Sequence, residues 1–358
     1  MVSTAFNKEI NPRIVAIGTA NPPNAYTQQE VIDYYQETNP KIIRLFKNSH
    51  IKQRYLYLPK KENGIPQQES NQELIDKHTQ GALTLGMEAI TKCLTTTGLA
   101  VTDIDYLCCV SSTGYLCPGI SAKLIKEMGF RPDCQRVDIL GMGCNAGMNA
   151  LQPVTNFTRA NPGKNALLVC VEICSAAYVN NDSLVTAVVN SLFGDGVAAI
   201  LVKNELEPGN WQKGPVIRDF ESHIITDAIH TMRFDLENDK LSFFLDRDIP
   251  YVLGLNIEKP IQRLLERHQL HIRDIRHWII HPGGKKVINA IKYNLGLTDY
   301  DVRHTLHVLN NYGNLSSCSF LFAYQQLYEE QVTDQHDLGI AIAMGPGASI
   351  EAALLEWV

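Results

Sequence analysis

An internal repeat is the feature of this 358-residue chain that most restricts its fold. Residues 102–106 lead into an apolar segment, a Ser-Thr-Gly turn and a helical pattern. Residues 273–277 lead into an apolar segment, a His-Pro-Gly-Gly turn and another helical pattern. Asp274 follows Asp103 by 171 positions, and an offset of 170 carries Cys144 onto Asn314. Such a repeat predicts two duplicated βα units, with an active site where the units meet.

Apolar segments rich in β-branched residues alternate with helical patterns, which predicts an α/β fold with buried central strands. The expected strands cover residues 14–17, 106–110, 166–171, 197–202, 278–280 and 339–343. The expected helices cover residues 71–97, 121–129, 145–160, 257–268, 285–295 and 316–331. We assign residues 1–210 to an N-terminal half that carries Cys144, and residues 211–358 to a C-terminal half that carries His281 and Asn314.

Two short glycine-containing turns are a further repeat shared by the two halves. Gly194-Asp195-Gly196 and Gly345-Pro346-Gly347 each precede an apolar strand. Because glycine permits tight backbone turns, we predict that both are hairpin turns.

Charge and cysteine content exclude several classes of protein. The net charge of −6 and the lack of a basic block argue against a nucleic-acid partner. The polar start and the absence of a run of roughly 18 apolar residues predict a cytoplasmic protein with no membrane partner. An odd set of nine cysteines argues against a disulfide framework. Neither a CxxC pair nor an HExxH motif is present, so we expect no metal.

Cys144 is the strongest candidate nucleophile. It follows Gly-Met-Gly and precedes a helix-compatible run, which predicts a sharp turn that places the sulfur at a helix N-terminus. The unpaired N–H groups there favour an anion, so we expect a lowered thiol pKa and a thiolate near neutral pH. The alternative for any single cysteine is a small buried hydrophobic residue, but the flanking glycines favour the functional interpretation.

His281 and Asn314 are the candidate partners of this thiol. His281 follows the predicted strand 278–280, and active-site residues of α/β sheets gather at the carboxyl ends of strands. The alternative interpretation of His281 is a structural histidine in a turn that hydrogen-bonds to the backbone. Asn314 stands in Asn-Tyr-Gly-Asn-Leu-Ser-Ser before a predicted helix, and its alternative is an ordinary N-cap.

Together these motifs resemble the chalcone synthase family, the type III polyketide synthases of the thiolase-like fold. The resemblance extends from Ile-Gly-Thr-Ala-Asn-Pro near the start, through Leu-Phe-Gly-Asp-Gly, to the Gly-Pro-Gly turn. It implies a five-layered αβαβα fold, a homodimer, and a buried cavity reached by a tunnel for the CoA arm. It implies no cofactor beyond CoA thioester substrates. Cys144 resembles the acylated nucleophile, and His281 and Asn314 resemble the pair that assists decarboxylation and binds the thioester oxygen.

The resemblance also implies roles for residues around the cavity. Lys41, Arg44 and Lys47 correspond to the cations at the tunnel mouth that bind CoA phosphates, although the third family position is Asn48 here. Phe220 and Phe243 resemble the two aromatic gatekeepers between tunnel and cavity. The remaining predicted substrate-binding residues are Phe193, Ala177, Ser316, Gly345, Pro346, Gly347 and Cys117.

Departures from the plant pattern bear on the product. Ala177 replaces a cavity threonine, which enlarges the pocket, and Cys117 replaces a methionine that reaches across the family dimer. These changes favour a microbial type of enzyme that extends an acyl starter with malonyl-CoA and cyclises the chain to a resorcinol-like or dihydroxyphenyl product. The starter would arrive on CoA or on an acyl carrier protein.

Three alternatives remain at this point. A ketoacyl synthase III shares the fold and the Cys, His, Asn order but stops after one condensation. A papain-like cysteine hydrolase also orders Cys, His and Asn, but its Cys-Gly-Ser-Cys-Trp motif is absent here. A thioester-binding scaffold without turnover has no support, because all three polar residues are present.

Overall fold

Nine strands form a mixed sheet that has two parts. The computed structural model describes residues 12–177, 183–204, 214–237 and 240–358, so the predicted boundary at residues 210 and 211 lies outside the described residues. The strand order is β13-β14-β15-β10-β1-β9-β8-β6-β7, and β1 meets β10 at the pair Arg13 and Val216. In one part lie β1 (Arg13–Ala20), β9 (Gly196–Lys203), β8 (Asn165–Glu172), β6 (Tyr106–Ser111) and β7 (Gln135–Leu140). In the other lie β10 (Val216–Ile224), β15 (Ser349–Glu356), β14 (Leu338–Gly345) and β13 (His277–Ile280).

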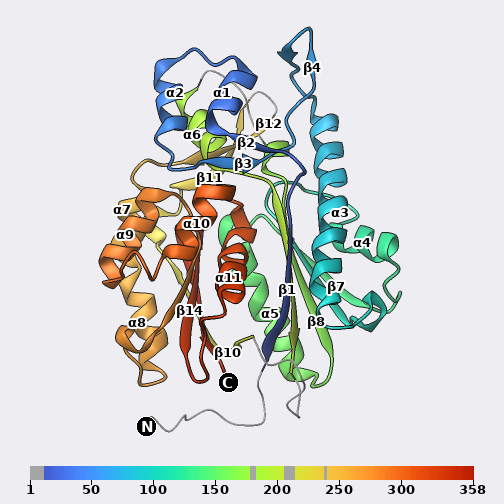
Figure 1. The fold of residues 1–358 in the computed structure, drawn as a ribbon, viewed down its shortest axis with the longest axis vertical. Coiled ribbons are helices and arrows are strands. Elements are labelled where there is room, and N and C mark those ends of the chain that lie inside the picture. The colour runs from blue at the N-terminus through green and yellow to red at the C-terminus, as the bar shows by residue number, and fades with distance from the viewer. Residues whose placement is uncertain (1–11, 178–182, 205–213, 238–239) are drawn as a thin grey trace.

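Helices separate and cover the two parts of the sheet (Figure 1). Between them lie α5 (Ala146–Ala160) and α11 (Ser319–Glu330), whose apolar side chains share one core with both parts. Helices α3 (Asn71–Thr95) and α4 (Ile120–Met128) pack on the outer face of the first part. Helices α7 (Ile249–Asn256), α8 (Glu258–Glu266) and α9 (Lys285–Leu295) pack on the outer face of the second. These layers confirm the predicted five-layered αβαβα fold.

Strand periodicity explains why the central strands are apolar throughout. Successive side chains of a strand point to opposite faces. In β8, Leu167 and Val169 pack with α3 and α4, while Leu168 and Cys170 pack with α5 and α11. Both faces are therefore buried, and an uninterrupted apolar run results.

A cap of short elements covers the ends of the layers beside Cys144. It contains α1 (Gln28–Tyr35), α2 (Pro40–Lys47), α6 (Leu184–Leu192) and the hairpin of β11 (Met232–Glu237) and β12 (Lys240–Leu245), at the top of Figure 1. One apolar cluster joins α1, α2 and α6 to Cys144. The smaller elements of the described chain are β2 (Ala25–Thr27), β3 (Gln53–Tyr55), β4 (Lys61–Glu62), β5 (Ile65–Pro66), α10 (Arg303–Tyr312) and the 3-10 turns, among them η2 (Gly143–Asn145), η3 (Cys174–Ala177) and η6 (Ser316–Cys318).

The predicted strands and helices are all present, with ends that differ by a few residues, but one predicted hairpin is wrong. Gly345-Pro346-Gly347 does connect β14 to β15. Gly194 and Asp195 instead follow helix α6 and lead into β9, whose antiparallel neighbours are β1 and β8. The glycine signal located a turn correctly, but it could not tell a helix-to-strand turn from a hairpin.

All nine cysteines are free thiols. Among the residues with a described placement, no group of His, Cys, Asp and Glu side chains is arranged to hold a metal ion. None of the helices formed by these residues is long and apolar enough to cross a membrane.

Candidate active site

Glycines shape the turn that carries Cys144. Cys144 lies in η2, immediately before α5, as the sequence predicted. Gly143 has φ of +71°, and a Cβ there would lie 2.2 Å from Cδ of Pro346. A Cβ on Gly345 would likewise lie 2.2 Å from Oδ1 of Asn145. The turn and the β14–β15 hairpin therefore fit together only because both glycines lack a side chain.

This packing corrects the predicted role of the Gly-Pro-Gly turn. Gly345, Pro346 and Gly347 do not line the cavities described below, although they were predicted to bind substrate. They lie behind the Cys144 turn and support it, because the tight hairpin brings Pro346 against Gly143.

His281 and Asn314 share a cavity of about 800 Å³ with Cys144. His281 follows β13, and its backbone N–H donates to the carbonyl of Ile342 at 2.8 Å. Oδ1 of Asn314 accepts from the backbone N–H of Ser316 at 2.8 Å, which leaves the amide N–H₂ for the sulfur of Cys144. The predicted trio thus meets at one place, and both partners are only 2% exposed.

A backbone contact between the halves positions this trio. Phe193 and Asn314 form a parallel bridge. The N–H of Gly194 donates to the carbonyl of Asn314, and the N–H of Asn314 donates to the carbonyl of Leu192, both at 2.9 Å. The loop after α6 and the loop after α10 therefore hold each other in place beside Cys144.

Burial sets the protonation of the thiol and the imidazole. It raises the pKa of Cys144 to about 12, even though hydrogen bonds from Ser316 and Asn314 favour the thiolate. Burial also lowers the pKa of His281 to about 3. Burial of the sulfur therefore opposes the predicted thiolate near neutral pH, because loss of water around the sulfur acts against the helix N-terminus. His281 lies in the same cavity and is the candidate group to take the thiol proton.

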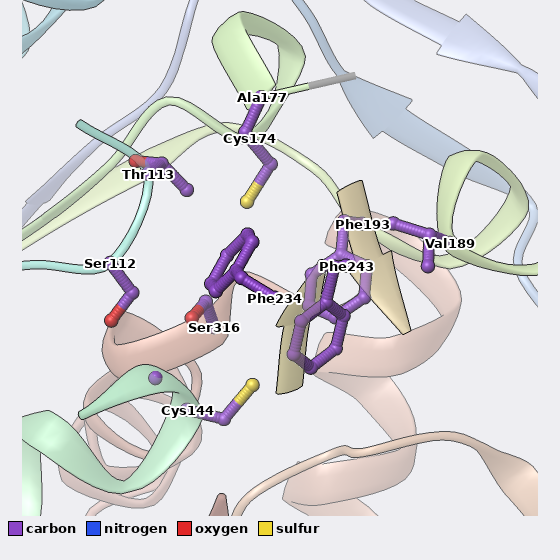
Figure 2. Close-up of a pocket in the computed structure, with 11 residues that line it drawn as sticks. Ser112, Thr113, Cys144, Cys174, Ala177, Val189, Phe193, Phe234, Phe243 and Ser316 are labelled. Carbon is purple, nitrogen blue, oxygen red and sulfur yellow. The ribbon is translucent and has the colours of Figure 1, made fainter. Parts of the chain in front are cut away.

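An inner chamber of about 40 Å³ continues from Cys144 (Figure 2). The thiols of Cys144 and Cys174 point into it from opposite sides, with the ring of Phe234 between them. Ala177 and Ser316 line it, as predicted. Ser112, Thr113, Cys174, Val189 and Phe234 were missed, although Cys174 lies in the same segment as Ala177.

Phe193 and Phe243 stand between the inner chamber and the larger cavity, since both line both spaces. Their rings meet edge to face, with centroids 5.9 Å apart. The prediction that Phe220 faces the cavity is wrong. Phe220 lies on β10, and its ring packs in the core between the two parts of the sheet. The aromatic partner of Phe243 is instead Phe193.

Basic side chains surround the outer part of the larger cavity. Lys41 and Arg44 line it, as predicted, whereas Lys47 does not. Along an α-helix, Lys41, Arg44 and Asn48 fall on one face, and Lys47 lies beside that face. Three cations that sequence analysis missed, Arg247, Lys285 and Lys286, complete the rim. Lys285 and Lys286 directly follow the His-Pro-Gly-Gly motif, which is the signal that could have identified them.

Two further residues near the site have different placements. Cys117 is exposed and does not line the described cavities, so its predicted contact with a second subunit stays a prediction.

Glu172 is fully buried behind the inner chamber, where it accepts hydrogen bonds from the N–H of Ser112 and from Ser317. Burial raises the pKa of Glu172 to about 7, while the hydrogen bonds from Ser317 and Ser112 act in the opposite direction.

Comparisons with known proteins agree with this geometry. Residues 2–205 match the family model described as chalcone and stilbene synthases, N-terminal domain, and residues 220–358 match the C-terminal domain. A 3,5-dihydroxyphenylacetyl-CoA synthase from Amycolatopsis orientalis is 47% identical over 348 residues, which cover 96% of this chain and 93% of that protein.

Solved structures give the same result. A polyketide synthase from the brown alga Ectocarpus siliculosus superposes with a TM-score of 0.90 at 27% identity, covering 98% of this chain and 100% of that one. The 1,3,6,8-tetrahydroxynaphthalene synthase of Streptomyces coelicolor A3(2) superposes with a TM-score of 0.87 at 25% identity, covering 96% and 99%. The chain therefore belongs to the chalcone and stilbene synthase family and is an acyltransferase of the type III polyketide synthase class.

Proposed function

We propose that this enzyme joins malonyl-CoA units on Cys144 and closes the chain to a 3,5-dihydroxyphenyl thioester. The observation that carries the proposal is the meeting of Cys144, His281 and Asn314 in one cavity that continues, past Phe193 and Phe243, into a second chamber. The 47% identity to a 3,5-dihydroxyphenylacetyl-CoA synthase supports this product.

The first step transfers the starter from CoA to the enzyme. Sγ of Cys144 attacks the thioester carbonyl, and its proton passes to His281. The bond between the carbonyl carbon and the CoA sulfur breaks, and the released CoA thiolate takes the proton. Cys144 then carries the acyl group as a new thioester.

The second step forms the carbon–carbon bond. N–H groups of the neutral His281 and of Asn314 bind the thioester oxygen of malonyl-CoA, so the electron pair left by departing carbon dioxide is held as an enolate. The enolate carbon attacks the carbonyl on Cys144, the bond to sulfur breaks, and the extended chain remains on CoA. No cofactor is required in this scheme, because carbon dioxide leaves without an external base.

Product analysis tests the proposal. Purified enzyme is given malonyl-CoA alone and malonyl-CoA with acyl-CoA starters, and products are identified by mass spectrometry. We expect a dihydroxyphenyl thioester with carbons from several malonyl units. A single extension would favour a ketoacyl synthase III, and open-chain pyrones alone would exclude the proposed ring closure.

Ala177 is expected to control how far the chain grows, because it lines the inner chamber and a further cavity beside it. Ala177→Leu adds three carbons at this junction. We expect the dihydroxyphenyl product to fall roughly tenfold relative to shorter products. Quantitative mass spectrometry of both product classes checks this, and an unchanged ratio would show that the junction does not limit chain length.

The basic rim is proposed to bind the phosphates of CoA. Reversing a charge there should weaken binding without affecting the chemistry, so Arg44→Glu and Lys286→Glu are each expected to raise KM for malonyl-CoA about tenfold, with little change in kcat. Lys47→Glu is the matched control, because Lys47 is on the same helix as Arg44 but does not line the cavity. Equal effects of all three changes would indicate that CoA responds to the overall electrostatic potential of the protein and not to contacts with these rim residues.

We also propose that the enzyme is a homodimer and that an acyl carrier protein can replace CoA as the starter donor. The family resemblance supports the dimer, as do the exposed side chains of Tyr115, Met142 and Leu140 on and beside the edge strand β7. The mass of the protein in solution tests the dimer, and acyl transfer from a carrier protein to Cys144 tests the donor.

A further inference from the structure

Asn145 directly follows Cys144 and is buried, with only 2% of its surface exposed. An asparagine at the start of a helix commonly accepts a hydrogen bond from a first-turn N–H. Asn145 occupies this position before α5, but its side chain makes no such bond. Its amide nitrogen instead donates to Oγ of Ser349 on β15, at 2.6 Å. The side chain therefore ties the Cys144 turn to a strand of the C-terminal half.

Ser349 connects this contact to the hairpin that supports the Cys144 turn. Its hydroxyl donates to the carbonyl of Pro346 at 3.1 Å. Pro346 is the residue that fits against Gly143, on the other side of Cys144 in the chain. One hairpin therefore holds both neighbours of Cys144, Gly143 by packing and Asn145 by a hydrogen bond.

The other polar atom of the Asn145 side chain has no partner. Oδ1 is buried, makes no hydrogen bond to the described residues, and lies against Gly345. A buried acceptor without a partner is costly, and an apolar side chain would avoid this cost. The atom that does have a partner is the amide nitrogen, so the bond to Ser349 is the feature that explains a polar side chain here.

Neither residue acts by touching the substrate. Asn145 and Ser349 are buried, and they do not line the cavities described above. Cys144, in contrast, lines both the inner chamber and the larger cavity. An effect of either residue on the reaction must therefore pass through the position of Cys144.

A second contact of the same kind lies further along α5. Asn149 follows Asn145 by one helical turn, and its side chain hydrogen-bonds to Glu351, two positions after Ser349 on β15. Side chains two positions apart on a strand share a face. The two contacts therefore join the same parts of α5 and β15, and the first of them adjoins Cys144.

We propose that Asn145 and Ser349 are positioning residues that fix the direction of the Cys144 thiol for attack on the bound thioester. The inference rests on the proposed role of Cys144 as the nucleophile. The attack requires Sγ to lie close to the carbonyl carbon, and a displacement of about 1 Å can lower a rate about 10²-fold. Packing at Gly143 alone leaves the turn free to pivot, because glycine has the most permissive backbone. The bond from Asn145 to Ser349 removes this freedom.

Four variants and a control separate this role from general support of α5. Asn145→Ala removes the donor, Ser349→Ala removes the acceptor, and the double variant removes both. Ser349→Thr keeps the hydroxyl. Asn149→Ala is the matched control, because it removes the contact with Glu351 and leaves the bond beside Cys144 intact.

Two activities are measured for each protein. The rate of acylation of Cys144 by an acyl-CoA starter is followed by intact-protein mass spectrometry after rapid quenching. Decarboxylation of malonyl-CoA is followed by release of labelled carbon dioxide, and in the proposed scheme it needs His281 and Asn314 but not the thiol. A change in the direction of the thiol lowers the first rate alone, whereas damage to the whole site lowers both.

We expect acylation to fall about tenfold in Asn145→Ala and in Ser349→Ala, with no further loss in the double variant, because both changes remove one interaction. Ser349→Thr should recover most of the lost rate, and Asn149→Ala should stay close to the wild-type rate. Decarboxylation should remain close to the wild-type rate in every variant.

Three results would overturn the inference. An equal loss of acylation in Asn149→Ala would show that these contacts only hold α5 on β15. A parallel loss of decarboxylation would show general damage to the site, and wild-type acylation in both alanine variants would show that the bond has no effect. If the wild-type enzyme forms no adduct on Cys144, the proposed function itself fails, which differs from an adduct that forms equally fast in every variant.

Discussion

Replacing Cys144 by alanine is expected to reduce polyketide formation by at least about 10⁴-fold, because no other group would carry the growing chain. Decarboxylation of malonyl-CoA should continue, since His281 and Asn314 remain in the cavity. Intact-protein mass spectrometry should show an acyl adduct on the wild-type enzyme and none on Cys144→Ala. Release of labelled carbon dioxide measures the remaining decarboxylation.

Cys174→Ala is the matched control for this experiment. Cys174 is also buried and points its thiol into the same inner chamber (Figure 2). Burial raises its pKa well above the usual range, and it does not line the cavity that holds His281. The adduct should therefore persist in Cys174→Ala. An adduct that is present on Cys144→Ala and absent from Cys174→Ala would show that Cys174, and not Cys144, is the nucleophile.

His281→Ala is expected to lower both decarboxylation and condensation, in contrast to Cys144→Ala. Removing the imidazole has two effects. It removes the N–H that is proposed to bind the enolate oxygen, and it removes the base that is proposed to receive the thiol proton. Loss of one such donor costs about 10²–10³-fold in rate. Carbon dioxide release and product formation should fall together, and both can be followed in one labelled assay.

His304→Gln is the control for loss of a buried histidine. His304 is paired with Glu330 and does not line the described cavities. Its replacement should therefore affect the melting temperature more than the rate. Full decarboxylation by His281→Ala would show that Asn314 alone holds the enolate.

The apolar runs correctly predicted an α/β fold with buried central strands, because burial on both faces makes these strands continuously apolar, whereas the five layers came from the family resemblance. The sequence also predicted that Cys144, His281 and Asn314 meet, because each follows a glycine-rich or strand-end motif, and the structure places all three around one cavity. The placement of Cys144 before α5 was confirmed.

The errors arose where the prediction depended on which way a side chain faces. Phe220 lies within β10 and faces the core, whereas Phe193 lies between α6 and β9, where its bridge to Asn314 brings it to the cavity. The pKa of Cys144 depended on the cap formed by α1, α2 and α6, which removes water from the sulfur. The rim cations come from α2, α9 and the segment before α7, and their proximity follows from the fold alone.

The contact between the Cys144 turn and the Ser316 turn has an evolutionary consequence. The two turns occupy equivalent positions in the repeat, so they descend from one ancestral turn if the halves arose by duplication. The first turn holds the thiol of Cys144, and the second follows Asn314, whose amide is proposed to bind the substrate. Neither copy retains the complete chemistry, so the two halves have become mutually dependent and can be inherited only as a unit.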